Sequence, residues 1–331
     1  YNGKFNSNRE FIYSMSQIEV DTILPQSGTT LTLGSSGDTV TIPSGVSLAP
    51  GGGLTLTGNF VVDGGTIKLD GNYPTGTDNV AMGDTALDSV EAGGVNNTAI
   101  GSNAGTAITT GDSNTAVGSK ALDANTTASK NTAIGRDSLT TNTTGCFNTA
   151  VGESSMAANT TGNCNIAVGM CSLAANTTGT QNVSTGTCAL TANTTGSNSA
   201  AFGFCALASG TTANLNTAIG NFALKTTQNG CKNTAVGYQS MFDATSAECN
   251  VALGSYSLAN NTTANFNTAL GACSMYSNET GANNVAVGYN SLYSNTTADD
   301  NTAVGLCSLQ ANTTGTPNVA VGSSALRDNT T

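Results

Sequence analysis

The chain has 331 residues, of which 40 are Gly, 20 are acidic, nine are basic, and none is His or Trp. Without His, a catalytic triad that uses His as its base and a zinc site with His ligands are both excluded. The formal net charge of −11 with few cations argues against nucleic-acid binding, because contacts to phosphate need clustered Lys and Arg.

Residues 15–70 alternate apolar and polar side chains in short runs between Gly, Ser and Pro, such as Thr-Leu-Thr-Leu and Thr-Val-Thr-Ile. Alternation of this kind predicts short strands. A Pro and two Gly residues follow within residues 71–78. We therefore place a boundary there and expect a β-rich N-terminal segment over residues 15–78.

Residues 1–14 match neither this segment nor the sequence after it. They precede Met15, and the run Met-Ser-Gln-Ile-Glu-Val is typical of a natural start. We expect residues 1–14 to be a non-native leader translated from upstream DNA. Native protein that begins at Tyr1 would contradict this expectation.

From Asn79 onward a single motif recurs, Asn-Thr/Val-Ala-Val/Ile-Gly. Its closing Gly returns first after eighteen positions and then at every seventeenth position, thirteen times in succession. The 15 closing glycines are Gly83, Gly101, Gly118, Gly135, Gly152, Gly169, Gly186, Gly203, Gly220, Gly237, Gly254, Gly271, Gly288, Gly305 and Gly322. Residues 79–331 are therefore an array of one small unit, which must be recognised before any fold is assigned.

Equivalent positions in successive repeats form columns with restricted residue types. The residue two before the closing Gly is Ala except at Ser184, and the fourth after it is Leu or Met except at Gly105. The second residue after the Gly is of any type, so we expect that column to face solvent. The structural positions of three successive repeats are Asn114, Ala116, Gly118, Leu122, Asn131, Ala133, Gly135, Leu139, Asn148, Ala150 and Gly152.

A 17-residue unit is too short for a helical-hairpin repeat, and its short Thr/Val stretch bounded by Gly predicts a strand. We expect an all-β fold, a parallel β-solenoid of about 15 coils over residues 79–331, with two strands and two turns in each coil. Asn-Thr-Thr-Gly is expected to form one turn, because Asn and Gly accept left-handed backbone angles. Coils about 4.8 Å apart make a rod of roughly 70 Å, stabilised by contacts between neighbouring coils.

The large apolar columns decide whether such a rod is monomeric. Alternation along the strand puts Asn, Ala and Gly on one side and Thr and Val on the other. If the Val/Ile and Leu/Met columns face outward, they form an apolar stripe too long for a monomer to expose, and we expect a homotrimer. The alternative is a monomer in which these columns fill the coil.

The chain ends at Thr331 inside a repeat, without a changed terminal unit, although terminal solenoid coils usually need one. We therefore expect the solenoid to be truncated at its C-terminus. The sequence contains no continuous apolar stretch of the length that a membrane-spanning helix needs, so no membrane-inserted segment is expected in it.

The unit Asn-Thr-Ala-Val-Gly-x-x-Ala/Ser-Leu resembles the Asn-Ser-Val-Ala-Ile-Gly repeats in the heads of trimeric autotransporter adhesins. The run from Val20 to Leu48 and the run from Gly65 to Gly83 look like tail-fibre and appendage proteins of marine bacteriophages, including cyanophages. The first resemblance implies a parallel β-roll packed as a trimer. The second implies attachment to a virion through the N-terminal segment and a distal tip that binds the host, and this chain contains no such tip.

Nine Cys residues follow the repeat. Cys171, Cys188 and Cys205 share the variable column, and stacking would bring them into one ladder. Two pairs, Cys146 with Cys164 and Cys231 with Cys249, share one offset that exceeds the repeat by a single position, which suits a disulfide between adjacent coils if their Cβ vectors agree. Free thiols are the favoured state in a reducing cytoplasm, and no metal site is expected, because Cys-x-x-Cys pairs are absent.

Three other functions have less support. The Asn-Thr-Thr runs match glycosylation acceptors, but the repeat explains them as turns. An ice-binding face would need regular Thr files, whereas the Thr of Asn-Thr-Ala is replaced at Val80, Ile166 and Val183, among others. Carboxylates are scattered over unlike columns, while paired catalytic acids need a fixed facing geometry. We expect no enzymatic activity and no cofactor.

These observations predict the structural shaft of a phage tail fibre or related virion appendage. The expected partners are further copies of the chain, other virion proteins at the N-terminal segment, and a host receptor contacted by a tip outside this chain. The head of a bacterial trimeric surface adhesin and an ice-binding solenoid are the alternatives. The expected location is the virion, or the bacterial surface if the adhesin alternative holds.

Overall fold

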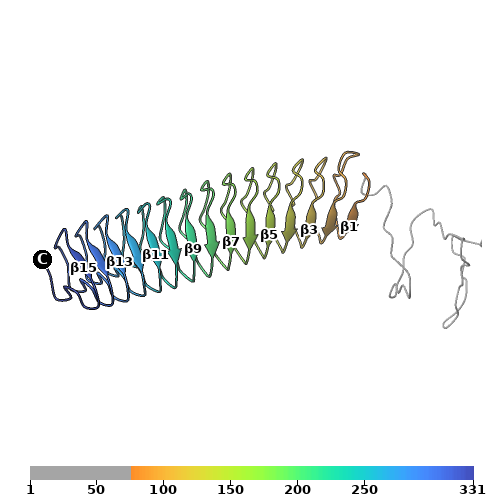
Figure 1. Cartoon of the computed structure of the whole chain (residues 1–331). Coiled ribbons are helices and arrows are strands. Elements are labelled where there is room, and N and C mark those ends of the chain that lie inside the picture. Colours follow the sequence, from red (N-terminus) through yellow and green to blue (C-terminus); the bar gives the residue numbers. More distant parts are fainter. Residues whose placement is uncertain (1–75) are drawn as a thin grey trace, which may run out of the picture. The chain divides into compact units, whose positions relative to one another are not determined.

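The computed structural model describes residues 76–331, which form one parallel sheet whose strands follow each other in chain order (Figure 1). This confirms the expected all-β parallel solenoid with 17-residue repeats. No helix occurs among these residues, and hence none that is long and apolar enough to cross a membrane. The expected leader at 1–14 and nearly all of the segment at 15–78 lie outside the described residues.

Each strand has three residues. Their bounds are β1 Val80–Met82, β2 Thr98–Ile100, β3 Thr115–Val117, β4 Thr132–Ile134, β5 Thr149–Val151, β6 Ile166–Val168, β7 Val183–Thr185, β8 Ala200–Phe202, β9 Thr217–Ile219, β10 Thr234–Val236, β11 Val251–Leu253, β12 Thr268–Leu270, β13 Val285–Val287, β14 Thr302–Val304 and β15 Val319–Val321. The register pairs identical positions, so that Ala133 lies opposite Ala116 and Ala150.

The prediction of two strands per coil was wrong, because each coil has one strand. The rest of the coil still bonds to its neighbours through the backbone: Leu139 N donates to Ser155 O at 3.0 Å, and Thr143 N donates to Thr160 O at 3.0 Å. These bonds do not make a second strand, because left-handed residues interrupt the extended backbone.

Left-handed backbone angles occur at three non-glycine positions in a typical coil. In the coil of β4 these are Asp137, Leu139 and Phe147, with φ of 57°, 49° and 60°. The Asn of Asn-Thr-Thr, such as Asn142, is not among them. The left-handed angles predicted for the Asn and Gly of this turn were therefore wrong, whereas the Thr hydroxyl does bond to backbone, as Thr143 Oγ1 does to Thr160 O. What this Asn supplies is its side-chain amide.

The closing Gly column is the position where the backbone requires glycine. Gly152 has a φ of 132°, and a Cβ built on it would lie 2.6 Å from the carbonyl carbon of Gly169 in the next coil. A side chain there would meet backbone that has no room to move. The column therefore fixes both the end of the strand and the spacing of the coils.

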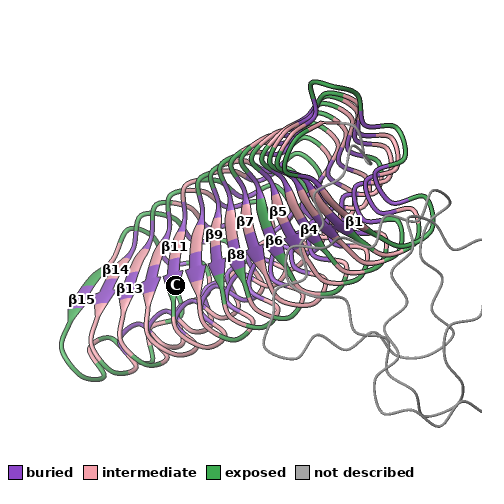
Figure 2. Cartoon of the chain, turned by 90° about the vertical axis from the view of Figure 1, so that its right-hand side faces the viewer, coloured by how far each residue is buried: buried purple, intermediate pink, exposed green. Residues whose placement is uncertain are grey.

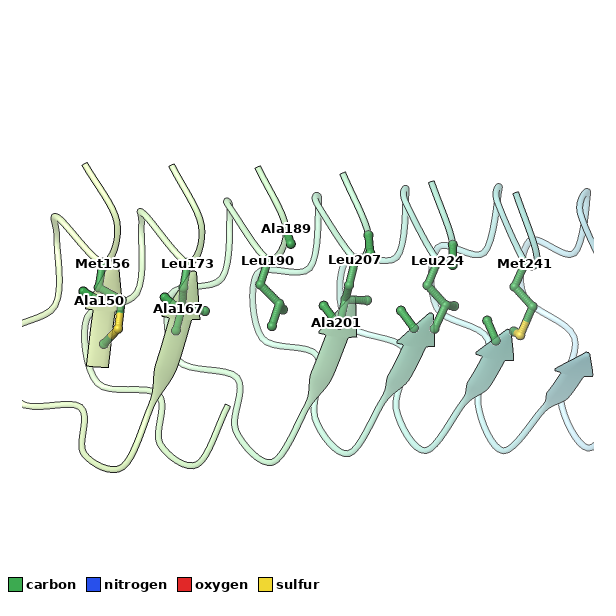
Figure 3. Close-up of a cluster of buried hydrophobic side chains, with 14 of the residues drawn as sticks. Ala150, Met156, Ala167, Leu173, Ala189, Leu190, Ala201, Leu207, Leu224 and Met241 are labelled. Atoms are coloured by element: carbon green, nitrogen blue, oxygen red, sulfur yellow. The ribbon is translucent and has the colours of Figure 1, made fainter. Parts of the chain in front are cut away.

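Two columns fill the interior of the rod. The middle residue of the strand, such as Ala150, and the Leu/Met column, such as Leu190 and Met241, are fully buried. Figure 3 shows the Leu/Met side chains in one row along the axis, beside the alanines of the strands. Each coil thus contributes one large and a few small apolar side chains to a narrow continuous core.

The exception at Gly105 in the Leu/Met column is compensated within its own coil. Ile108, three residues later, is fully buried at a position where most coils have Asn. A Cβ on Gly105 would lie 2.9 Å from Ile108 Cδ1 and 3.1 Å from Leu87 Cδ2. Ile108 therefore occupies the space that a Leu side chain fills in the other coils.

Two ladders of buried amides run beside this core. In the first, which contains the Asn that precedes every strand except β8, where Ser199 takes its place, Asn131 Nδ2 donates to Gly145 O at 2.9 Å and Asn131 Oδ1 accepts from Asn148 N at 2.9 Å. In the second, formed by the Asn of Asn-Thr-Thr, Asn142 Nδ2 donates to Asn125 Oδ1 at 2.9 Å. These buried amides link each coil to the next, which satisfies polar groups that the interior would otherwise leave unpaired.

Candidate functional surfaces

The residues singled out from the repeat are buried or lie at coil corners. Asn114, Asn131 and Asn148 stack in the first amide ladder, and the alanines and leucines of the same repeats line the core. Their place in the structure is architectural, since none presents a reactive group to solvent. Any recognition by this rod must therefore come from the outward columns.

The outer sheet face consists of the first and third residues of each strand. In β2 to β15 the middle residue is buried, whereas these two are partly or fully exposed. The third position is mostly Val, Ile or Leu, and Ile134 is 40% exposed and Ile219 is 41% exposed. Figure 2 shows exposed and half-buried positions recurring from coil to coil along the rod. The structure thus divides the two large apolar columns: Leu/Met fills the core and Val/Ile faces outward.

A second surface, the aromatic ladder, lies just beyond the strands and spans the coils of β8 to β13. Its members are Phe204, Phe222, Tyr238, Tyr256, Tyr276 and Tyr293. Successive ring centroids are 5.2, 6.2, 5.4, 6.3 and 5.2 Å apart. The first four contacts are edge-to-face and the last is stacked, which are the arrangements that aromatic quadrupoles favour.

One cation touches this ladder. Lys225 Nζ lies 5.2 Å from the ring centroid of Phe222 and 5.2 Å from that of Phe242. Burial against the neighbouring coils, followed by the influence of Tyr238, raises the pKa of the Tyr256 phenol. Burial likewise raises the pKa of the Tyr293 phenol, with Tyr276 as the next cause. The two hydroxyl groups therefore stay protonated at neutral pH.

All nine cysteines are free thiols. The ladder of Cys171, Cys188 and Cys205 forms as the spacing predicts, and burial raises the pKa of Cys171 and of Cys188, with the neighbouring thiol as the next cause.

The two cysteines of each proposed disulfide pair lie in adjacent coils and are joined by a backbone hydrogen bond, but no disulfide bond links their sulfur atoms. Cys164 N donates to Cys146 O at 3.0 Å, and Cys249 N donates to Cys231 O at 3.1 Å. The two pairings remain predictions for an oxidising environment.

The two threonines of Asn-Thr-Thr have different surroundings. The first hydroxyl donates to the next coil, as when Thr160 Oγ1 donates to Thr177 O at 3.0 Å. The second threonine is exposed in each coil that has it. We call this column the threonine ridge: Thr110, Thr127, Thr144, Thr161, Thr178, Thr195, Thr212, Thr263, Thr280, Thr297, Thr314 and Thr331. It is more regular than the Thr column within the strands.

Charged side chains are sparse and dispersed. Arg136 pairs with Asp137 at 2.8 Å and also with Glu153 in the next coil, and all three are at least partly exposed. Within residues 76–331 no three Cys, Asp or Glu side chains come together as metal ligands. Within the same residues, one exposed ring that is not part of the aromatic ladder also has a cation over its face: Lys130 Nζ lies 5.0 Å from the centroid of Phe147.

The aromatic ladder is not apparent from the columns of the repeat. Its rings occupy the first, second and fifth positions after the closing Gly, and these columns look unrestricted when all coils are considered together. The signal was present as a local one, since the ladder residues all fall between residues 204 and 293. No protein-family model and no curated protein sequence matches this chain.

Proposed function

We propose that this chain forms the shaft of a phage tail fibre or related virion appendage and that three copies associate along their outer sheet faces. The single observation that carries the proposal is a rod of similar coils with a mostly aliphatic column facing outward, which only Thr185 and Phe202 interrupt among the described strands. Such a rod suits a spacer that holds a host-binding tip away from the particle. Three parallel chains also raise the effective concentration of their tips.

The outer sheet face favours association with further copies of the same chain. Fifteen coils at about 4.8 Å make a strip of roughly 70 Å, longer than the apolar patches that monomers usually expose. A partner that matches this strip at every coil must have the same coil spacing, and a second copy has it by construction. Around a threefold axis each chain meets two neighbours, so closed symmetry covers all three strips.

A charge-substitution experiment tests the assembly. Ile134→Lys, Val151→Glu and Val168→Lys together place opposite charges on adjacent coils, so each coil keeps favourable neighbours. The matched control carries the same charges on the threonine ridge of the same coils, as Thr144→Lys, Thr161→Glu and Thr178→Lys. Light scattering after size exclusion should give three chains for wild type and control and one for the outer-face variant. A monomeric wild type would overturn the assembly.

The biological setting is tested by labelling. Antibodies raised against residues 79–331 should decorate fibres on virions in electron micrographs. Labelling of a bacterial outer surface instead would favour the alternative, the head of a trimeric adhesin. A chain that is monomeric yet decorates virions would leave the shaft proposal standing and refute only the trimer.

The threonine ridge favours one second candidate, ice binding. Its hydroxyls recur from coil to coil except in the coils of β9 and β10, where Asn229 and Ser246 replace Thr, and they are exposed and make no hydrogen bond within the described residues. The inner threonines beside it donate their hydroxyls to backbone carbonyls, as Thr143 does to Thr160 O at 3.1 Å, which leaves a single column instead of a flat array. Thermal hysteresis in solutions of the purified rod would support this function, and its absence would remove it.

A further inference from the structure

The aromatic ladder is not required by the coil. Its columns contain Ser119 and Lys120 in the coil of β3 and Arg136 and Asp137 in the coil of β4, with the same backbone angles and the same core. The fold therefore tolerates charged side chains where the later coils have rings. Association of copies does not explain the ladder either, because an outer face that repeats at every coil gives no reason for rings in only part of the rod.

The ladder is accessible from solvent. Phe204 is 45% exposed and Tyr238 is 43% exposed, and Phe222, Tyr256 and Tyr293 are half-buried. Tyr289, in the same column as Tyr238, is 53% exposed. Rings held by neighbouring rings lose little conformational entropy when a ligand packs on them. The ladder is thus a preorganised track parallel to the rod axis.

The polar groups beside the rings are neutral donors and acceptors. Asn221 and Gln239 lie in the ladder's columns, and the tyrosines add phenol hydroxyls. Lys225 is the cation in contact with the ladder, and it lies over Phe222 of the ladder and over Phe242 beside it. A net charge of −11 repels anionic polymers, and binding of nucleic acid needs several cations along the track.

We propose that the aromatic ladder binds a neutral polysaccharide that lies along the rod. The apolar C–H faces of sugar rings pack on aromatic faces, while their hydroxyl groups need neutral amides and phenols as hydrogen-bond partners. Rings that follow the coil rise of about 4.8 Å have a spacing similar to the length of one pyranose unit. An extended glycan therefore contacts several rings in succession, and weak contacts add up along the track. This site is independent of whether the rod belongs to a virion.

Native gel electrophoresis of the full chain in the presence of polysaccharide tests the site. The gels contain hydroxyethyl cellulose, galactomannan or dextran, and one gel contains the anionic polymer alginate. We expect at least one neutral polymer to retard the wild-type chain and alginate to have no such effect. Tyr238→Leu with Tyr256→Leu should weaken the retardation at least tenfold, because Leu keeps an apolar contact but removes ring and hydroxyl. Phe147→Leu, an exposed ring outside the ladder, is the matched control.

Tyrosine fluorescence gives a second measurement on the unmodified protein, which contains no Trp. Addition of the retarding polymer should change the emission, and the change should saturate. Three results overturn the proposal: no retardation by any of the three neutral polymers, equal retardation of the wild type and the double Leu variant, or stronger retardation by alginate. If the double variant does not fold, absence of a fluorescence change in the wild type is equally decisive.

Discussion

At the scale of single residues, buried Asn side chains hold the coils together, a role that a wide apolar core has in a globular protein. Asn131 accepts from Asn148 N, donates to Gly145 O, and its own N–H donates to Asn114 Oδ1 at 3.0 Å. The residue therefore bonds to the coils on both sides. A thin rod has little apolar volume per coil, and these bonds supply both cohesion and register.

Replacement of such an amide should be costly. Asn131→Ala leaves Asn148 N without its partner in the interior, and we expect a loss of about 2 kcal/mol in the free energy of unfolding. Asn221→Ala is the control, because this exposed side chain accepts from Phe204 N at 3.0 Å where water can take its place. The control should change stability by less than about 0.5 kcal/mol. Denaturant unfolding followed by circular dichroism measures both, and equal losses would contradict the role of burial.

The thiols make the rod sensitive to alkali. Burial raises the pKa of Cys171, Cys188 and Cys273 in the folded chain. As the pH rises above about 8.5, the unfolded chain loses these protons first. The stability contributed by the neutral thiols is therefore complete below that pH and is lost as the pH rises through the folded pKa values.

Thermal unfolding across this pH range tests the sign. The melting temperature should fall with rising pH, and it should fall less in a variant with Ser at all three positions, because Ser does not titrate there. Ser already occupies this column at Ser154 and Ser324. Parallel curves for wild type and variant would show that the thiols do not contribute.

At the scale of elements, the second amide ladder is interrupted in the coils of β8 to β10, where Gly210, Thr227 and Ala244 replace Asn. Asn193 is the last Asn before the gap, and its Oδ1 is buried without a hydrogen-bond partner. The hydroxyl of Thr227 is unpaired as well. The gap is therefore a local weakness in an otherwise continuous ladder.

Extension of the ladder should stabilise the rod. Gly210 has no left-handed φ, and a Cβ built on it would meet its nearest atom, Leu207 Cγ, at an ordinary 3.4 Å. Gly210→Asn would give Asn193 Oδ1 a donor, as Asn142 does for Asn125, and we expect a gain of about 1 kcal/mol. Gly210→Ala separates the effect of the amide from the loss of backbone freedom. If the two variants are equally stable, the unpaired oxygen has no cost.

The sequence predicts the elements unevenly, for physical reasons. The regular 17-residue repeat predicts a parallel stack of coils, because the coils then have Ala and Gly at the same positions, where neighbouring coils come close together. The left-handed angle of Leu139 is not predictable from propensity, since Leu disfavours it and only the burial of its side chain in the core compensates. For the same reason the count of strands per coil was wrong. The rings of the ladder are not predicted by the columns, because a column compares all coils together and the rings occur in only part of the array.

At the scale of the whole molecule, contacts between strands join only adjacent coils, so length is separable from fold. Deletion of residues 149–165 removes one coil and joins Asn148 to Ile166, which reproduces the junction of Asn165 and Ile166. We expect the β-sheet circular dichroism to persist and the melting temperature to change by less than about 3 °C. Deletion of residues 149–156 breaks the register and should lower the melting temperature far more. Similar losses in both would contradict independence of the coils.

The equivalence of coils also has a consequence for heredity. Because each coil corresponds to a whole number of codons and resembles its neighbours in sequence, misaligned recombination within the gene would add or remove entire coils and keep the reading frame. Descendant proteins would then differ in the length of the rod while its cross-section stays the same. A lineage can therefore sample different lengths without passing through misfolded intermediates, and the position of the aromatic ladder along the axis would shift with each such event.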